Sequence, residues 1–88
     1  MVMGESLIRE VHGVPAWLLK EYLIELGGES GGENLVSGDG WIATFIRIED
    51  FKIGSISVGR LRLQIDGDSG ALQNLVPQLE MKLLRGGG

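Results

Sequence analysis

The sequence RLRLQID at residues 60–66 alternates between polar and apolar side chains at every step. A period of two is typical of a β-strand that buries one face and leaves the other in water. The apolar positions are Leu61, Leu63 and Ile65. The polar positions are Arg60, Arg62 and Gln64. The stretch therefore predicts a sheet with one buried and one wet face.

Three further apolar stretches precede this one, and turn signals separate them. The stretches are LV at 35–36, WIATFIRI at 41–48 and FKIGSISV at 51–58. Asp39-Gly40 tolerates the positive φ of a two-residue hairpin turn. Glu49-Asp50 and Gly59 supply the two later turns. Together the four stretches predict a continuous antiparallel meander.

Both faces of the strand predicted at 41–48 are largely apolar. One face carries Ile42, Ile46 and Ile48, and the other carries Trp41, Ala43 and Phe45. We expect one of these faces to pack on helices and the other to be partly exposed or to meet a partner.

A strand and a helix precede the meander. The first ten or so residues predict a strand, in which the apolar positions are Leu7, Ile8 and Val11. Pro15 suits the first position of a helix over residues 15–26, and Gly27-Gly28 provides a stop. The segment GGESGGE at 27–33 has no lysine to hold phosphate, so we interpret it as a flexible connector.

A second helix follows the meander. Ser69 can cap it, and its apolar stripe is Leu72, Leu75, Val76, Leu79 and Leu83. Pro77 lies inside this helix, where we expect a kink or a restart. The sequence thus predicts one α+β domain over residues 1–88, of order β-α-β-β-β-β-α, with an antiparallel sheet and both helices on one face.

Composition argues against several functions. The chain has 88 residues, no cysteine, one histidine and a net charge of −4. The acidic balance repels nucleic acid and anionic membranes, so we expect neither as a partner.

Without cysteine we expect no metal site, and His12 is interpreted as a turn or edge residue. The serines lack a supporting base, so we expect no enzyme activity and no cofactor. The amino terminus resembles neither a secretory signal nor a membrane span, which favours a cytoplasmic location.

The first helix has a second apolar face. Trp17 and Ile24 lie seven residues apart and share that face with Lys20 and Glu21. Isolated exposed apolar residues are normal in a small domain. The alternative is a partner surface, because tryptophan is enriched at binding hot spots.

Three stretches carry a family resemblance. They are PAWLLKEYLIELGG at 15–28, FKIGSISVGRLRLQIDGD at 51–68 and RGGG at 85–88. From about residue 10 to 88 the chain resembles the small C-terminal domain of MoaD-related proteins. The resemblance implies a fold like that of the TATA-binding protein. In the family a sulfur-carrier type domain precedes this one, whereas no such domain is present in these 88 residues.

The resemblance also implies a role for the carboxyl end. In MoaD-like and ubiquitin-like proteins a terminal Gly-Gly is activated by an ATP-dependent adenylating enzyme, which matches Gly87 and Gly88 here. Arg85 would supply a charge near the channel of that enzyme, and 86–88 would form a flexible tail. The alternative interpretation is a helix stop, in which glycine ends the helix and Arg85 favours the helix dipole. Carriers of the ubiquitin class also have two strands before the main helix, whereas one is predicted here.

Two hypotheses follow. The first is a sulfur carrier or ubiquitin-like modifier of molybdopterin or thio-nucleotide biosynthesis, with an adenylating enzyme and a MoaD-like or synthase protein as partners. The second is a non-catalytic module that binds a protein or small ligand. Its surface would be the helix face of Trp17, Lys20 and Ile24 or the free sheet face, for which the candidates are Trp41, Phe45, Arg47, Arg60 and Arg62. Self-association through a sheet face or edge is a variant of the second.

Overall fold

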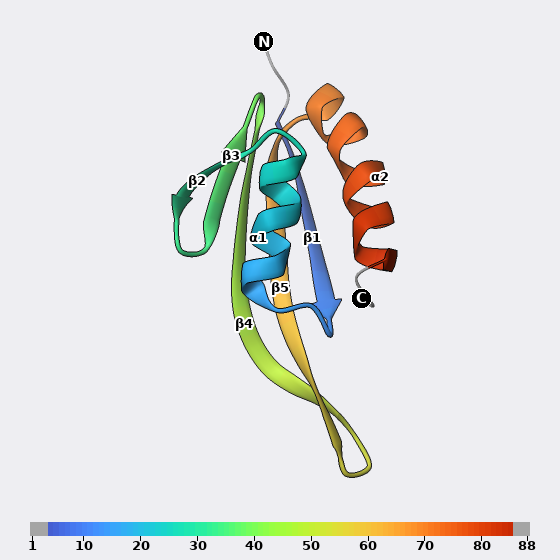
Figure 1. The fold of residues 1–88 in the computed structure, drawn as a ribbon. Coiled ribbons are helices and arrows are strands. Elements are labelled where there is room, and N and C mark those ends of the chain that lie inside the picture. The colour runs from blue at the N-terminus through green and yellow to red at the C-terminus, as the bar shows by residue number, and fades with distance from the viewer. Residues whose placement is uncertain (1–3, 86–88) are drawn as a thin grey trace.

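The computed structural model describes residues 4–85, which form one five-stranded sheet and two helices (Figure 1). In chain order the elements are β1 (Gly4–His12), α1 (Ala16–Glu25), β2 (Glu29–Gly32), β3 (Leu35–Gly38), β4 (Trp41–Ile53), β5 (Ile56–Asp68) and α2 (Ser69–Arg85). The predicted α+β class and element order are confirmed.

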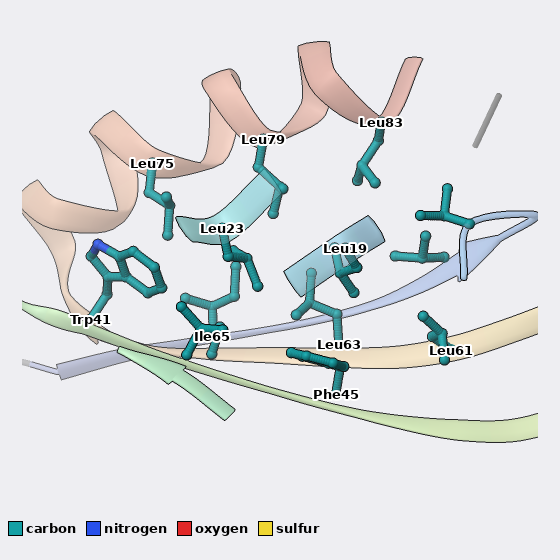
Figure 2. Close-up of a cluster of buried hydrophobic side chains, with 14 of the residues drawn as sticks. Leu19, Leu23, Trp41, Phe45, Leu61, Leu63, Ile65, Leu75, Leu79 and Leu83 are labelled. Atoms are coloured by element: carbon teal, nitrogen blue, oxygen red, sulfur yellow. The ribbon is translucent and has the colours of Figure 1, made fainter. Parts of the chain in front are cut away.

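The sheet is antiparallel throughout, and its strand order is β1-β5-β4-β3-β2. The longest strands, β4 and β5, have 13 residues each and lie at the centre. Both helices pack on the same face (Figure 2). The hairpin end of β4 and β5 extends past the helices as an arm (Figure 1), and the molecule measures 50 × 24 × 22 Å.

The core lies between the helices and one face of the sheet. As predicted, the alternation of β5 buries Leu61, Leu63 and Ile65. Leucines of both helices point down onto these side chains (Figure 2). The helix leucines in this layer are Leu19, Leu23, Leu72, Leu75, Leu79 and Leu83. Burial of this apolar layer is the main favourable term in folding.

Trp41 and Phe45 belong to this core, so their placement on a partner surface is corrected. They are only 6% and 2% exposed, because strand alternation turns them toward the helices. The Trp41 indole packs against Gly28 and Gly38, and a Cβ at either glycine would overlap it. The opposite face of the same strand, which carries Ile42 and Ile46, points away from the helices.

The segment predicted as a flexible connector contains an edge strand instead. Residues Glu29–Gly32 form β2, which pairs with β3 through a register shift between Ser30 and Gly32. The Lys20 ammonium on α1 donates a hydrogen bond of 2.9 Å to the Gly32 carbonyl oxygen. A side chain of the first helix therefore holds this edge in place.

The turns predicted at Glu49-Asp50 and Gly59 are also corrected. Strand β4 continues to Ile53, and the chain reverses at Gly54, whose φ is 60°. Glu49 and Asp50 form a bulge instead, since the register shifts between Ile48 and Phe51. The predicted strand at 51–58 is thus the tip of the central hairpin. The predicted hairpin turn at Asp39-Gly40 is confirmed, with a φ of 84° at Gly40.

Pro77 does not divide the second helix, so of the predicted kink or restart, the restart is wrong. One helix runs through it from Ser69 to Arg85. Proline removes a backbone donor from the helix interior. Beside it, the Gln78 side-chain amide donates a hydrogen bond of 2.9 Å to the Asn74 carbonyl oxygen. Burial of the leucine face outweighs the cost of the proline.

Gly67 lies at a point of β5 where β4 leaves no room for a Cβ. It pairs with Trp41, and a Cβ built on Gly67 would lie 2.8 Å from the Trp41 Cα and against the Gly40 carbonyl oxygen. These are backbone atoms, which cannot rotate away. Gly59 lies in the same strand and has open space around its Cα.

We expect Gly67→Ala to lower the free energy of unfolding by about 2 kcal/mol, because it overpacks a backbone contact. The matched control, Gly59→Ala, should leave it unchanged or raise it by up to about 1 kcal/mol, since alanine restricts the unfolded chain. Urea unfolding followed by tryptophan fluorescence measures both. Equal stability of the two variants would contradict this account of the strand contact.

Candidate functional site

The face of the sheet opposite the helices carries exposed apolar side chains, and we call it the open face. Its members follow from strand register, because Ile8, Gln64 and Thr44 lie in one row across β1, β5 and β4. In the rows on either side the β4 residues are Ile42 and Ile46, and Ile46 is 57% exposed. No element in residues 4–85 covers these side chains (Figure 1).

The bulge extends this face along the arm. Because β4 gains one residue at Glu49-Asp50, Phe51 pairs with Val58 and Ile53 with Ile56. Alternation along β5 puts Val58 and Ile56 on the side of Arg60 and Arg62. Phe51 and Ile53 therefore join the open face, and both are exposed, as is Ile56. Without the extra residue they would point to the other side.

Polar contacts join the arm to the body at one cluster. The Arg60 guanidinium donates hydrogen bonds to the Glu49 carbonyl oxygen at 2.9 Å and to Glu10 Oε1 at 3.2 Å. His12 Nε2 lies 3.5 Å from the same carboxylate oxygen. The His12 ring stacks on Phe51 with 5.6 Å between centroids. The hydrogen bond with His12, followed by the charge and hydrogen bond of Arg60, holds the pKa of Glu10 below its ordinary value.

A second set of contacts holds the bulge. The Ser57 hydroxyl donates to Asp50 Oδ2 at 3.1 Å, and the Arg47 guanidinium donates to Asp50 Oδ1 at 3.3 Å. These two hydrogen bonds lower the pKa of Asp50. Exposed pairs of this kind contribute little stability singly, but here they fix the backbone where the strand changes parity.

One cation of the open face has no anionic partner among residues 4–85. Asp66 accepts hydrogen bonds from Ser6 and Gln64, and Glu10 is engaged by Arg60. Arg62 is exposed between Ile46 on β4 and Glu10 on β1, yet it makes no ion pair within the described chain. The face is therefore an apolar stripe with one available guanidinium.

The structure separates the remaining predicted residues. Trp17 and Ile24 are exposed on α1, in the helix layer, whereas Arg62 lies on the opposite side of the sheet. Lys20 is occupied by its hydrogen bond to β2. Arg47 is exposed at the root of the arm, beside a cleft of about 370 Å³ that Arg60 also lines. The predicted surfaces on α1 and on the sheet are thus two separate regions.

The predicted carboxyl-terminal site lies largely outside the described residues. Arg85 is the last residue of α2, and Gly87 and Gly88 fall beyond residues 4–85. Within the described residues no cluster of histidine, aspartate and glutamate could hold a metal ion. Neither described helix is both long and apolar enough to span a membrane.

None of the six exposed apolar residues of the open face was among the surface candidates from the sequence: Ile8, Ile42, Ile46, Phe51, Ile53 and Ile56. The turn assigned to Glu49-Asp50 hid the last three. The usable signal was Gly54-Ser55, which divides FKI from ISV and allows one long hairpin with a bulge.

The fold and the open face define a class, that of small α+β domains with two helices on one sheet face and an apolar surface on the other. A family model described as archaeal MoaD-like protein matches residues 8–88. The chain therefore belongs to the archaeal MoaD-like protein family, which confirms the predicted relation to MoaD. No curated protein gave a significant match to the chain.

We expect the Glu10 carboxyl to titrate below its ordinary pKa, and His12→Ala to raise its pKa toward that value. Because the folded pKa is the lower one, the stabilisation is present above the unfolded pKa and is lost as pH falls through the folded pKa. Carboxyl NMR titration measures both variants. Asp50 is the internal control, since its pKa depends on Ser57 and Arg47 and should not respond. An ordinary Glu10 pKa in the wild type would contradict the cluster.

Proposed function

We propose that this MoaD-related protein is a non-catalytic protein-binding module whose docking surface is the open face. The supporting observation is that six large apolar side chains on this face are exposed: Ile8, Ile42, Ile46, Phe51, Ile53 and Ile56. Single exposed apolar residues are normal, but five of these six follow β4 and its hairpin partner, and a gathering of exposed apolar side chains marks an interaction surface. The face extends along two 13-residue strands, and such a long, open surface suits a protein better than a small molecule, which needs an enclosed pocket.

Charge narrows the chemistry of the partner. Arg62 lies within the apolar stripe beside Ile46 and has no anionic partner in the described chain. Covering an unpaired guanidinium with apolar groups is costly, so the partner must bring a carboxylate to it. We therefore expect a protein surface with apolar side chains around an aspartate or glutamate. The candidate partners are a MoaD-like protein or a synthase of molybdopterin or thio-nucleotide biosynthesis.

Ile46→Asp and Arg62→Glu should each weaken partner binding at least tenfold, about 1.4 kcal/mol. The first places a charge in the apolar stripe, and the second repels the expected carboxylate. Affinity enrichment from the cells of origin would identify the partner, and calorimetry with the purified partner would measure its dissociation constant for each variant.

Trp17→Asp is the matched control, since it changes an equally exposed apolar residue in the helix layer. It should leave the dissociation constant unchanged. If binding instead fails with Trp17→Asp and survives both sheet variants, the partner docks on α1 and the proposal is wrong.

A second candidate function, a sulfur carrier or ubiquitin-like modifier, is favoured by the family match and by the glycines at 86–88. It requires Gly88 to carry a free carboxylate. Adenylation would join that carboxylate to the AMP of ATP with release of pyrophosphate, and a sulfur nucleophile or lysine would then displace AMP. The described topology gives this candidate no support, because a single strand precedes α1 and all pairings are antiparallel.

Intact-mass spectrometry of the protein from its own cells tests the carrier function. A carrier should show one oxygen replaced by sulfur, or an isopeptide adduct at Gly88. Deleting Gly87 and Gly88 should abolish the modification while partner binding by the open face persists. An unmodified mass after incubation with ATP and cell extract would leave the glycines as a helix stop.

A further inference from the structure

The two edges of the sheet differ in how they are protected. Edge strand β2 has four residues, contains a register shift and two glycines, and receives the Lys20 side chain. Edge strand β1 has nine residues and pairs with β5 from Gly4↔Asp68 to His12↔Arg60 without any shift. Soluble proteins usually blunt their edges with short strands, bulges or proline. The described part of β1 has none of these three features, and its charged residues, which also protect edges, are Glu5, Arg9 and Glu10.

The groove beside β1 is bordered by one strongly exposed apolar side chain, Leu84. Arg9 on β1 forms an ion pair with Glu80 on α2, so the helix runs along this edge. Between them lies a groove of about 190 Å³, which Leu83 and Leu84 line. Leu84 is 76% exposed, the highest value among the large apolar side chains described, and Ile8, on the open-face side of the same strand, is 63% exposed. A strand added to β1 would lie along this groove.

We propose that β1 pairs antiparallel with β1 of a second copy of this chain, about a two-fold axis at Ile8. This register uses all nine residues of the strand and places the two exposed Ile8 side chains opposite each other. It also opposes no like charges, because Glu5, Arg9 and Glu10 fall opposite Val11, Leu7 and Ser6 of the second copy. The charged residue nearest the axis, Arg9, is already neutralised by Glu80.

The pairing joins two five-stranded sheets into one continuous sheet. Open-face residues of one copy lie opposite open-face residues of the other, so both open faces lie on the same side of the joined sheet. The contact is self-complementary and therefore closes as a dimer. The dimer therefore carries a docking surface twice as wide. The pairing rests on the edge and its neighbours alone, so it stands or falls independently of the proposed function.

Light scattering tests the assembly. We expect the wild type to have twice the chain mass of 9.5 kDa and Ile8→Arg to have the single mass, because two like charges would meet at the axis. Ile46→Arg, an equally exposed substitution on the same face, should remain dimeric. Circular dichroism checks that both variants fold. A wild type that stays at 9.5 kDa up to millimolar concentration overturns the proposal.

Single-cysteine crosslinking tests the register. The chain has no cysteine, so Ile8→Cys introduces a unique thiol. Side chains directly opposite in an antiparallel pair have Cβ atoms about 5 Å apart. We expect a short bis-maleimide to link Ile8→Cys into dimers and to leave Ile46→Cys monomeric on a denaturing gel. Crosslinking of Ile46→Cys alone would assign the contact to the open face and overturn the edge pairing.

Discussion

The pairing of β4 with β5 is the interaction on which the rest of the structure depends. Each strand has 13 residues; β1 pairs with β5, β3 pairs with β4, and β2 joins the sheet through β3. Its alternation sends Phe45 and Leu63 toward the helices and Ile46 and Arg62 away from them. A shift of one residue would exchange these two sets and destroy the core. Gly67 permits the close approach of the two strands at one end, and the bulge at Glu49-Asp50 turns Phe51 and Ile53 to the open face at the other.

The pairing of β4 with β5 also explains where the two proposed surfaces, the open face and the β1 edge, lie. Both helices pack on one face of the sheet and cover it as far as the root of the arm. The other face is left with the apolar residues of β4 and with Arg62. Of the two edges, β2 is short and held by Lys20, whereas β1 is long and regular. The open face and the β1 edge are therefore the surfaces on which this member of the archaeal MoaD-like family is proposed to act.

Much of this architecture could be predicted from the sequence. Apolar residues recur at every second position of 60–66 and at helical spacing in both helices. Each pattern allows only one buried face, so the core was predicted correctly. The face of Trp41 could not be assigned, because both sets of the strand at 41–48 are apolar. Only the pairing with β5 and the small residues Gly28 and Gly38 decide that the indole is buried. The bulge was missed since Glu49-Asp50 resembles a turn, and β2 was missed because its stability comes from pairing and from Lys20, not from its own residues.

Amide hydrogen exchange tests most directly the central claim that the sheet keeps its β1 edge for association. Strands β1 and β2 are the two edges of the sheet, so within residues 4–85 no neighbouring strand accepts hydrogen bonds from their outward-pointing amides. If β1 is an association edge, its amides should exchange slowly at high protein concentration and fast on dilution, whereas those of β2 should be fast at both. Equally fast exchange in both strands at every concentration would contradict the account.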